Sequence, residues 1–403
     1  MRMQKQLNFI RNSIVEIFNN YKFFFLVIFL VLLSYNYYLS YYSAIATSQD
    51  MQWYPSTLLW DNLNPYQEYL NGREWFLSQN PNYGHFLYIL MYPLTTLEWE
   101  NVKIIWAILS MLLYIIIMLL FLYKGKLSLA FVLFISVFLV AGYPLSNTIG
   151  NGQISIFIAF FTTIAWIYRK DSLIITSLAL SIVFVKYSFG LPILFAFLLA
   201  GYYKQVVIAG LINLLTIFYF SVAFNISILE SALLPLKVAM STGVGPIDLM
   251  SLGKLLVDNN YIDIKISFLL IILVFLLYAG YILKNYKLLS DSAIIGSGIL
   301  LSLVLFFHLG YDHTMFIISI FILKERFKAS SIIIILSSIL SIFLWQIGRI
   351  NSLFHLDLHV STNMGIPYTL IISILTICLS FYILYTDRNN KIDAILKNEI
   401  SPL

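Results

Sequence analysis

Apolar runs recur along the whole chain of 403 residues, and many of them are long enough to cross a lipid bilayer. The hydrocarbon core of a membrane is about 30 Å thick, which a helix of about 20 apolar residues spans. Apolar residues make up 60% of the chain and charged residues 11%, against about 45 to 50% and 25% in soluble domains. The runs are continuous and do not alternate with polar residues, so the sequence predicts membrane-spanning helices and excludes a barrel.

About twelve spans are predicted from apolar runs that are bounded by charges, glycine or proline. They cover residues 23–42, 104–123, 127–145, 154–168, 172–186, 189–203, 205–225, 265–283, 291–309, 313–323, 329–347 and 366–386. Several, notably 313–323, are shorter than the roughly 17 residues of a straight crossing, which is typical of a broken helix or a thinned membrane. We expect an all-α polytopic protein that forms a single integral membrane domain over residues 1–403.

Lysine and arginine residues gather on alternate connections between the predicted spans, and carboxylates on the others. The positive connections include residues 124–126, 169–170, 284–287 and 324–328, and the tail at 388–391 is also positive. Because cytoplasmic loops carry the excess of positive charge, both termini are predicted to be cytoplasmic. A multi-pass protein of the plasma (inner) membrane is expected, and the net charge of +5 forms no nucleic-acid-binding patch.

Three predicted outer connections are long, at residues 43–103, 226–264 and 348–365, whereas the inner connections are mostly two to six residues. Binding and catalytic residues are found disproportionately on loops, so function is expected on the outer face. Within the first loop, residues 86–97 are apolar and contain Pro93, which favours a short interfacial or re-entrant helix. The tryptophans of this loop are more typical of interface anchors than of sugar platforms.

Asp50 directly follows the outer end of the first predicted span, in the stretch SQDMQWYPSTLLWDNLNPY. A carboxylate at the level of the lipid headgroups is partly desolvated, which suits it to proton abstraction. A solvated loop carboxylate is the alternative interpretation of the same position. Asp61, in Asp-Asn-Leu-Asn-Pro, fits a turn or a helix cap better than a reactive group.

Two other positions carry polar side chains that their surroundings do not explain. In SNTIGNGQISIF the glycines let the backbone approach a ligand closely, and Gln153 can hydrogen-bond a hydroxyl-rich one; a tight turn explains the glycines but not Gln153. Lys186 falls within the apolar stretch LSIVFVKYSFGLP, where a charge is costly without a partner. An anionic lipid phosphate is one such partner, and snorkelling to the interface is the alternative.

The stretch FFHLGYDHTMF gathers His308, Tyr311, Asp312 and His313 between two predicted spans. An Asp and His at this spacing can form an acid–base or orienting pair, and can also ligate a metal. A second cluster alternates along the stretch HLDLHV, at His355, Asp357 and His359. It allows a divalent-metal patch, but a solvated loop is the favoured interpretation. The chain contains no nucleotide-binding phosphate loop, cysteine-rich site or Gly-x-Ser-x-Gly elbow.

Four stretches resemble motifs of glycosyltransferase family 87, the GT-C class of polyprenol-phosphate-mannose-dependent mannosyltransferases. The stretch from Asp50 resembles the family's Asp-x-x-x-Tyr, which ends at Tyr54, and the Asn-Pro-Tyr that follows it. YILMYPLTTL resembles its Tyr-and-Pro segment, GNGQISIFIAF its Gly-Gln-x-Asn, and LALSIVFVKYSFGLPIL its Lys-x-x-Pro region. The likeness is clear over about residues 20–210. Ser155 departs from the usual Asn, and Pro192 lies farther from Lys186 than in the family pattern.

The resemblance implies a GT-C-like fold, a lipid-linked sugar donor, Asp50 as general base and His313 in a histidine-containing outer motif. It also implies that a set of polar residues contacts the donor or acceptor, namely Tyr54, Asn64, Tyr66, Gln153, Lys186, Tyr311 and Asp312. The expected partners are a polyprenyl-phosphate sugar, with mannose favoured, a lipid or glycan acceptor, and membrane lipids, but no nucleic acid. No cofactor is expected, and a divalent metal is not required.

Two other functional classes compete with this interpretation. A transporter or lipid flippase predicts ionisable residues that pair across helices at mid-membrane depth, whereas most charges here lie at the ends of the predicted helices and Lys186 is ambiguous. A polymerase or ligase of lipid-linked glycans would use an outer cluster of arginine or histidine. The outer face offers few arginines, chiefly Arg73 and Arg349, which disfavours that class.

Overall fold

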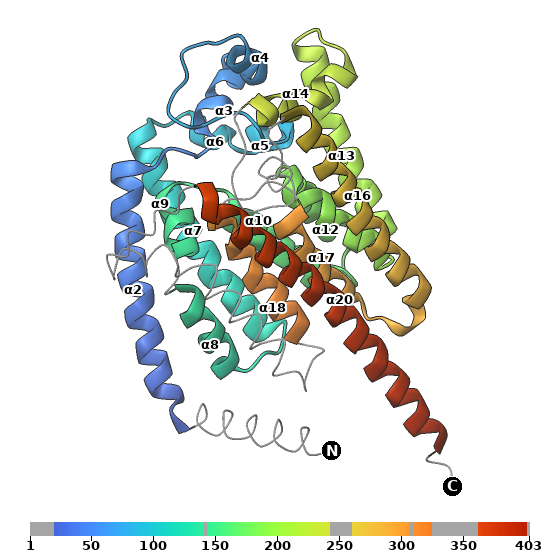
Figure 1. Cartoon of the computed structure of the whole chain (residues 1–403). Helices are drawn as coiled ribbons and strands as arrows, with labels where there is room; N and C mark the ends of the chain where they lie inside the picture. The colour runs from blue at the N-terminus through green and yellow to red at the C-terminus, as the bar shows by residue number, and fades with distance from the viewer. Residues whose placement is uncertain (1–19, 141–142, 242–259, 306–309, 325–361, 401–403) are drawn as a thin grey trace.

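The computed structural model describes residues 20–140, 143–241, 260–305, 310–324 and 362–400, and every regular element in these ranges is helical. The longer helices pack side by side into a bundle (Figure 1). They are α2 (Lys22–Thr47), α7 (Trp99–Tyr123), α8 (Leu129–Val140), α10 (Ser155–Tyr168), α11 (Leu173–Val183), α12 (Tyr187–Leu199), α13 (Tyr203–Ala223), α16 (Asn260–Asn285), α17 (Asp291–Leu305), α18 (Phe316–Lys324) and α20 (Thr362–Ile400). The predicted all-α class is confirmed for the described residues.

Among the residues that the structure describes, four helical segments are long and apolar enough to cross a membrane, and they occupy Phe23–Ala46, Trp99–Tyr123, Tyr203–Ala223 and Leu269–Leu288. The apolar helices α10, α11, α12 and α17 have 11 to 15 residues. At 1.5 Å per residue they reach only about 16 to 23 Å. Twelve full crossings are therefore not confirmed, although a membrane protein is consistent with the four long segments. The predicted span 329–347 lies outside the described residues.

Four short helices from the predicted loop 43–103 gather at one end of the bundle (Figure 1). They are α3 (Trp53–Trp60), α4 (Pro65–Leu70), α5 (His85–Leu90) and α6 (Tyr92–Thr95). We call residues 48–98 the capping lobe. Helices α5 and α6 lie where the sequence predicts a short helix, and Pro93 falls in the first turn of α6.

Aromatic side chains form the core of the capping lobe. The ring of Trp53 lies 5.8 Å from that of Phe76 and 5.7 Å from that of Trp99, which begins α7, and its indole N–H donates to the Leu94 carbonyl at 3.1 Å. Trp75 packs edge-on against Tyr54 at 5.0 Å. Such pairs stabilise a fold beyond their buried area. These residues therefore pack the lobe, whereas the sequence predicts that the tryptophans anchor the chain at the membrane interface.

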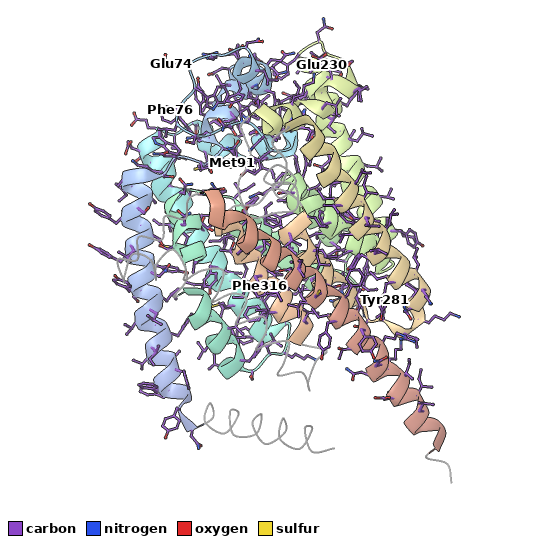
Figure 2. The ribbon with its side chains drawn as sticks, in the orientation of Figure 1. Glu74, Phe76, Met91, Glu230, Tyr281 and Phe316 are labelled. Atoms are coloured by element: carbon purple, nitrogen blue, oxygen red, sulfur yellow. The ribbon has the colours of Figure 1, made fainter. Side chains whose placement is uncertain are left out.

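The described start and end of the chain lie at the end of the bundle away from the capping lobe (Figure 1). Figure 2 places Glu74 and Glu230 at the end that carries the capping lobe and Tyr281 towards the other. The described start of α2 and the end of α20 also lie at that other end (Figure 1). The start of α2 and the end of α20 thus lie on one side of the bundle (Figure 1), and the location of both termini in the cytoplasm stays a prediction.

A cluster around Asp291 joins three helices at the end away from the lobe. The Asp291 carboxylate contacts Arg169 Nε at 2.9 Å and Lys170 Nζ at 3.1 Å, and it accepts a hydrogen bond from the Tyr202 hydroxyl at 2.6 Å. Arg169 follows α10, Tyr202 precedes α13, and Asp291 begins α17. Asp387 of α20 accepts from the Ser290 N–H at 2.7 Å, so the same end also fixes the C-terminal helix.

His85 fastens the capping lobe to α14 (Ile228–Ser241), which lies in the predicted loop 226–264. Its Nε2 lies 3.0 Å from the Ser231 hydroxyl and its Nδ1 3.2 Å from the Tyr66 hydroxyl. The side chain is 1% exposed. Burial lowers the pKa of His85 to about 3, and the hydrogen bond with Ser231 opposes this only in part. The imidazole is therefore neutral at physiological pH.

We expect this buried histidine to make the lobe sensitive to acid. Because the folded-state pKa of His85 lies below its unfolded value of about 6.5, the unfolded chain binds more protons between pH 6.5 and 3. The free energy of unfolding should then decrease by up to about 1.4 kcal/mol per pH unit in that range. His85→Gln should lose this contribution, and thermal unfolding in detergent from pH 7 to pH 4 measures it. Equal pH slopes for the variant and the wild type would contradict the assignment.

Candidate active site

Asp50 lies at the junction between the bundle and the capping lobe, in the link between α2 and α3. Its backbone N–H donates to the Asn151 carbonyl at 3.1 Å, and its carboxylate accepts a hydrogen bond from the Gln153 side-chain amide. Gln153 is fully buried and follows α9 (Tyr143–Gly150). One turn, at residues 151–155, therefore holds both the backbone and the side chain of Asp50.

Gly152 explains how the turn reaches Asp50. Its φ of 75° lies in the left-handed region that favours glycine. A Cβ atom at this position would lie 2.7 Å from Ser48 Oγ and 3.0 Å from Met51 Cβ. The sequence predicts that glycine here lets the backbone approach a ligand. In the structure the close approach is to the segment that carries Asp50.

A second carboxylate, that of Asp312, lies at the other side of the same turn. Asp312 belongs to η2 (Gly310–Met315), is 2% exposed, and accepts a hydrogen bond from the Ser155 hydroxyl. Lys186, which directly precedes α12, lies 2.5 Å from it through Nζ. Lys186 is itself buried, and its Nζ lies 5.1 Å from the centroid of the Phe189 ring. The partner of the Lys186 charge in the structure is therefore a protein carboxylate, and the side chain does not snorkel to an interface.

The two carboxylates come together because Gln153 and Ser155 are two residues apart and each binds one of them. His313, next to Asp312, is 2% exposed and so belongs to the same buried region. Tyr83 lies close enough to both carboxylates to feel their charge. Burial, followed by Asp50 and Asp312, raises the pKa of Tyr83 well above its ordinary value. Figure 2 places Met91 of the lobe near this junction and Phe316, which follows η2, deeper in the bundle.

Three of the predicted binding residues contribute to the framework of the capping lobe. Asn64 caps α4, because its side-chain oxygen accepts from the N–H groups of Tyr66 at 3.1 Å and Gln67 at 3.3 Å. Tyr66 is fully buried and donates to the Tyr83 carbonyl at 2.7 Å. Tyr54 packs its ring on Trp75. Contacts of these three residues with a substrate stay a prediction.

Of the other candidate residues from the sequence, one lies at a turn, and the side chains of the rest lie outside the described residues. Asp61 ends α3 as an exposed cap residue, which confirms the turn interpretation. The side chain of Tyr311 lies outside the described residues, as does the alternating cluster at His355, Asp357 and His359. Within the described ranges, no three His, Cys, Asp or Glu side chains gather so that they could hold a metal ion.

Two residues of this region are absent from the predicted site, namely Tyr83 and Ser155. Ser155 appears in the sequence only as a departure from a motif, and its hydrogen bond with Asp312 joins positions 157 residues apart. Tyr83 stands in the stretch NPNYGH, which carries no local signal beyond a turn. Only the tertiary structure places Tyr83 in this region, because the N–H of the next residue, Gly84, donates to the carbonyl of Val185, which precedes Lys186.

The described site combines a carboxylate, hydrogen-bond donors and one ion pair. Asp50 is a carboxylate whose position is fixed by Gln153, so it can take a proton from a bound hydroxyl group. The amide oxygen of Gln153 is buried without a hydrogen-bond partner among the described residues. It can accept a hydrogen bond from a ligand. This combination suits a reaction in which a hydroxyl group acts as nucleophile.

Comparison with known proteins bears on this region directly. The family model described as glycosyltransferase family 87 matches residues 82–307, which is more than half of the chain. No curated protein and no solved structure shows significant similarity. The matched segment runs from the link before α5 to the end of α17. It contains Tyr83, Gln153, Ser155 and Lys186.

The buried ion pair predicts an asymmetric response to substitution. Asp312→Ala leaves the Lys186 ammonium buried without its carboxylate, so the free energy of unfolding should decrease by about 3 kcal/mol. The double variant Lys186→Met with Asp312→Leu removes both charges and should lie within about 1 kcal/mol of the wild type. Unfolding of the single and double variants in detergent measures this coupling. Wild-type stability of Asp312→Ala would show that the ion pair contributes nothing.

Proposed function

The chain belongs to glycosyltransferase family 87, and from this premise we propose that it transfers a hexose from a polyprenyl-phosphate donor to a lipid or glycan acceptor. Membership of this family makes the chain a membrane glycosyltransferase. Mannose is the favoured sugar, because the resembled class uses polyprenol-phosphate mannose. The proposed reaction takes place on the outer face of the plasma membrane and inverts the anomeric configuration.

The observation that carries the proposal is the carboxylate of Asp50, held by Gln153 at the junction of the bundle and the capping lobe. In the proposed step Asp50 takes the proton of the acceptor hydroxyl as its oxygen bonds to the anomeric carbon. The bond from that carbon to the phosphate oxygen breaks, and its electron pair leaves with polyprenyl phosphate. In an inverting displacement the base activates the nucleophile on the face of the sugar opposite the leaving group, which is the role proposed for Asp50.

The position of the site favours a lipid-linked donor over a nucleotide sugar. The turn at 151–155 lies between α9 and α10 and contacts the link that leaves α2, so the polar groups lie where apolar helices end. A polyprenyl chain in the bilayer would bring its phosphate and sugar to this level without transport of a nucleotide. Neither a cofactor nor a divalent metal takes part in the proposed step.

Lys186, Asp312 and His313 would serve the leaving phosphate. Lys186 supplies a positive charge to the donor side, although its contact with Asp312 offsets part of that charge. His313 lies next to Asp312 and would complete the phosphate side of the site. The oxygen of the Gln153 amide would accept from a sugar hydroxyl. In this scheme the ion pair organises the donor side, and Asp50 acts on the acceptor.

The ion pair also gives the transporter or flippase alternative its one supporting observation, because a buried Lys–Asp pair is typical of membrane transporters. The family match favours the transferase. Purified protein incubated with polyprenyl-phosphate mannose, glucose, galactose or arabinose and extracted lipid acceptors separates the two. A transferase releases polyprenyl phosphate and forms a new glycoside, whereas a flippase leaves both substrates chemically unchanged.

We expect Asp50→Asn to abolish sugar transfer while the protein still folds and inserts into the membrane. Loss of a general base lowers rates by about 10² to 10⁴-fold, and the asparagine side chain keeps nearly the same size. The matched control is Asp61→Asn, because Asp61 is an exposed cap residue of α3 in the same lobe. Transfer by both variants is measured at equal amounts of folded protein. Full activity of Asp50→Asn would disprove its role as base.

A further inference from the structure

Tyr83 lies within the charged cluster although the proposed step assigns it no task. It belongs to the link between α4 and α5 and is 6% exposed. Its ring centroid lies 5.9 Å from Lys186 Nζ. The carboxylates of Asp50 and Asp312 both act on its phenol group. The ring therefore lies beside Lys186, and its phenol group is exposed to the charge of both carboxylates.

The backbone of Tyr83 is fixed on both sides. Its carbonyl accepts from the Tyr66 hydroxyl at 2.7 Å, and its N–H donates to the Tyr88 hydroxyl at 3.4 Å. The next N–H, that of Gly84, donates to the Val185 carbonyl at 2.6 Å. A Cβ atom on Gly84 would lie 3.2 Å from Val185 Cα, so glycine permits this close docking. The side chain of Tyr83 is thereby held beside the residue that precedes Lys186.

The hydroxyl of Tyr83 differs from those of its neighbours. The Tyr66 hydroxyl donates to the Tyr83 carbonyl. The Tyr88 hydroxyl donates to the side-chain oxygen of Gln52. The hydrogen bonds of Tyr83 with described residues use its backbone, and its hydroxyl oxygen is not among the fully buried atoms that lack a partner, so a ligand can reach it. The raised pKa of Tyr83 keeps its phenol protonated, so the group is a donor at physiological pH.

We propose that Tyr83 is a further substrate-contacting residue whose hydroxyl donates a hydrogen bond to a phosphate oxygen of the lipid-linked sugar donor. This inference rests on the proposed function. As the bond from the anomeric carbon to oxygen breaks, the electron pair stays on the phosphate, and a fixed neutral donor stabilises the growing charge. Lys186 is already in contact with Asp312. A neutral donor adds this stabilisation without a further charge that must be buried.

The test measures binding of polyprenyl phosphate and of the uncharged polyprenol to purified protein in detergent. Wild-type protein should prefer the phosphate, and Tyr83→Phe should lose about tenfold or more of that preference, because a hydrogen bond to a charged group is lost. Binding of polyprenol should not change. The matched control is Tyr92→Phe, because Tyr92 is exposed in the same lobe and its ring packs on Trp60. Transfer by Tyr83→Phe should show a lower kcat and an unchanged KM for the acceptor.

The outcomes separate this inference from the proposed function. A wild-type protein that binds polyprenol as tightly as polyprenyl phosphate would overturn the donor class, and the role of Tyr83 with it. A wild-type preference that Tyr83→Phe retains in full would overturn the role of Tyr83 alone. Weaker binding of both ligands together with a lower unfolding temperature would show that Tyr83 serves the fold, which also overturns the inference.

Discussion

The need to place two carboxylates beside apolar helices governs the end of the bundle that carries the capping lobe. Burial of a carboxylate is unfavourable unless hydrogen bonds or an opposite charge compensate it. The turn at residues 151–155 meets this need for both groups, because Gln153 binds Asp50 and Ser155 binds Asp312. Lys186 supplies an opposite charge to Asp312. The turn thus fixes where α2, α10, η2 and the start of α12 meet.

The capping lobe depends on that arrangement and completes it. Its aromatic core attaches it to α7 through Trp53 and Trp99, and His85 attaches it to α14 through Ser231. Between these anchors the lobe brings Tyr83 beside Lys186. Tyr66 connects the packing of the lobe to the charged cluster. Its hydroxyl donates to the Tyr83 carbonyl, and its ring packs against that of His85. A residue of the lobe can therefore affect the site without any contact with a substrate.

At the opposite end of the bundle a partly buried carboxylate is also compensated, but there by two cations and a hydroxyl group. There a single carboxylate, that of Asp291, receives Arg169, Lys170 and the Tyr202 hydroxyl. Cations exceed carboxylates in this cluster, whereas carboxylates exceed cations among Asp50, Asp312 and Lys186. Helix α10 connects the two clusters, with Ser155 at its start and Arg169 directly after its end. The charge asymmetry that the sequence shows between its connections thus corresponds to two differently built ends.

The sequence by itself determined the helical class and singled out Asp50, Gln153, Lys186 and Asp312 as candidates, because unpaired charges and amides are costly among apolar residues. Only the tertiary structure decided their partners. The pairs Asp50–Gln153 and Lys186–Asp312 are 103 and 126 residues apart, and no local pattern encodes such contacts. The same limit applies to Tyr83, which only packing of the lobe reveals. The tertiary structure also decided the lengths of the helices. Several apolar helices end at turns after fewer residues than a bilayer crossing needs.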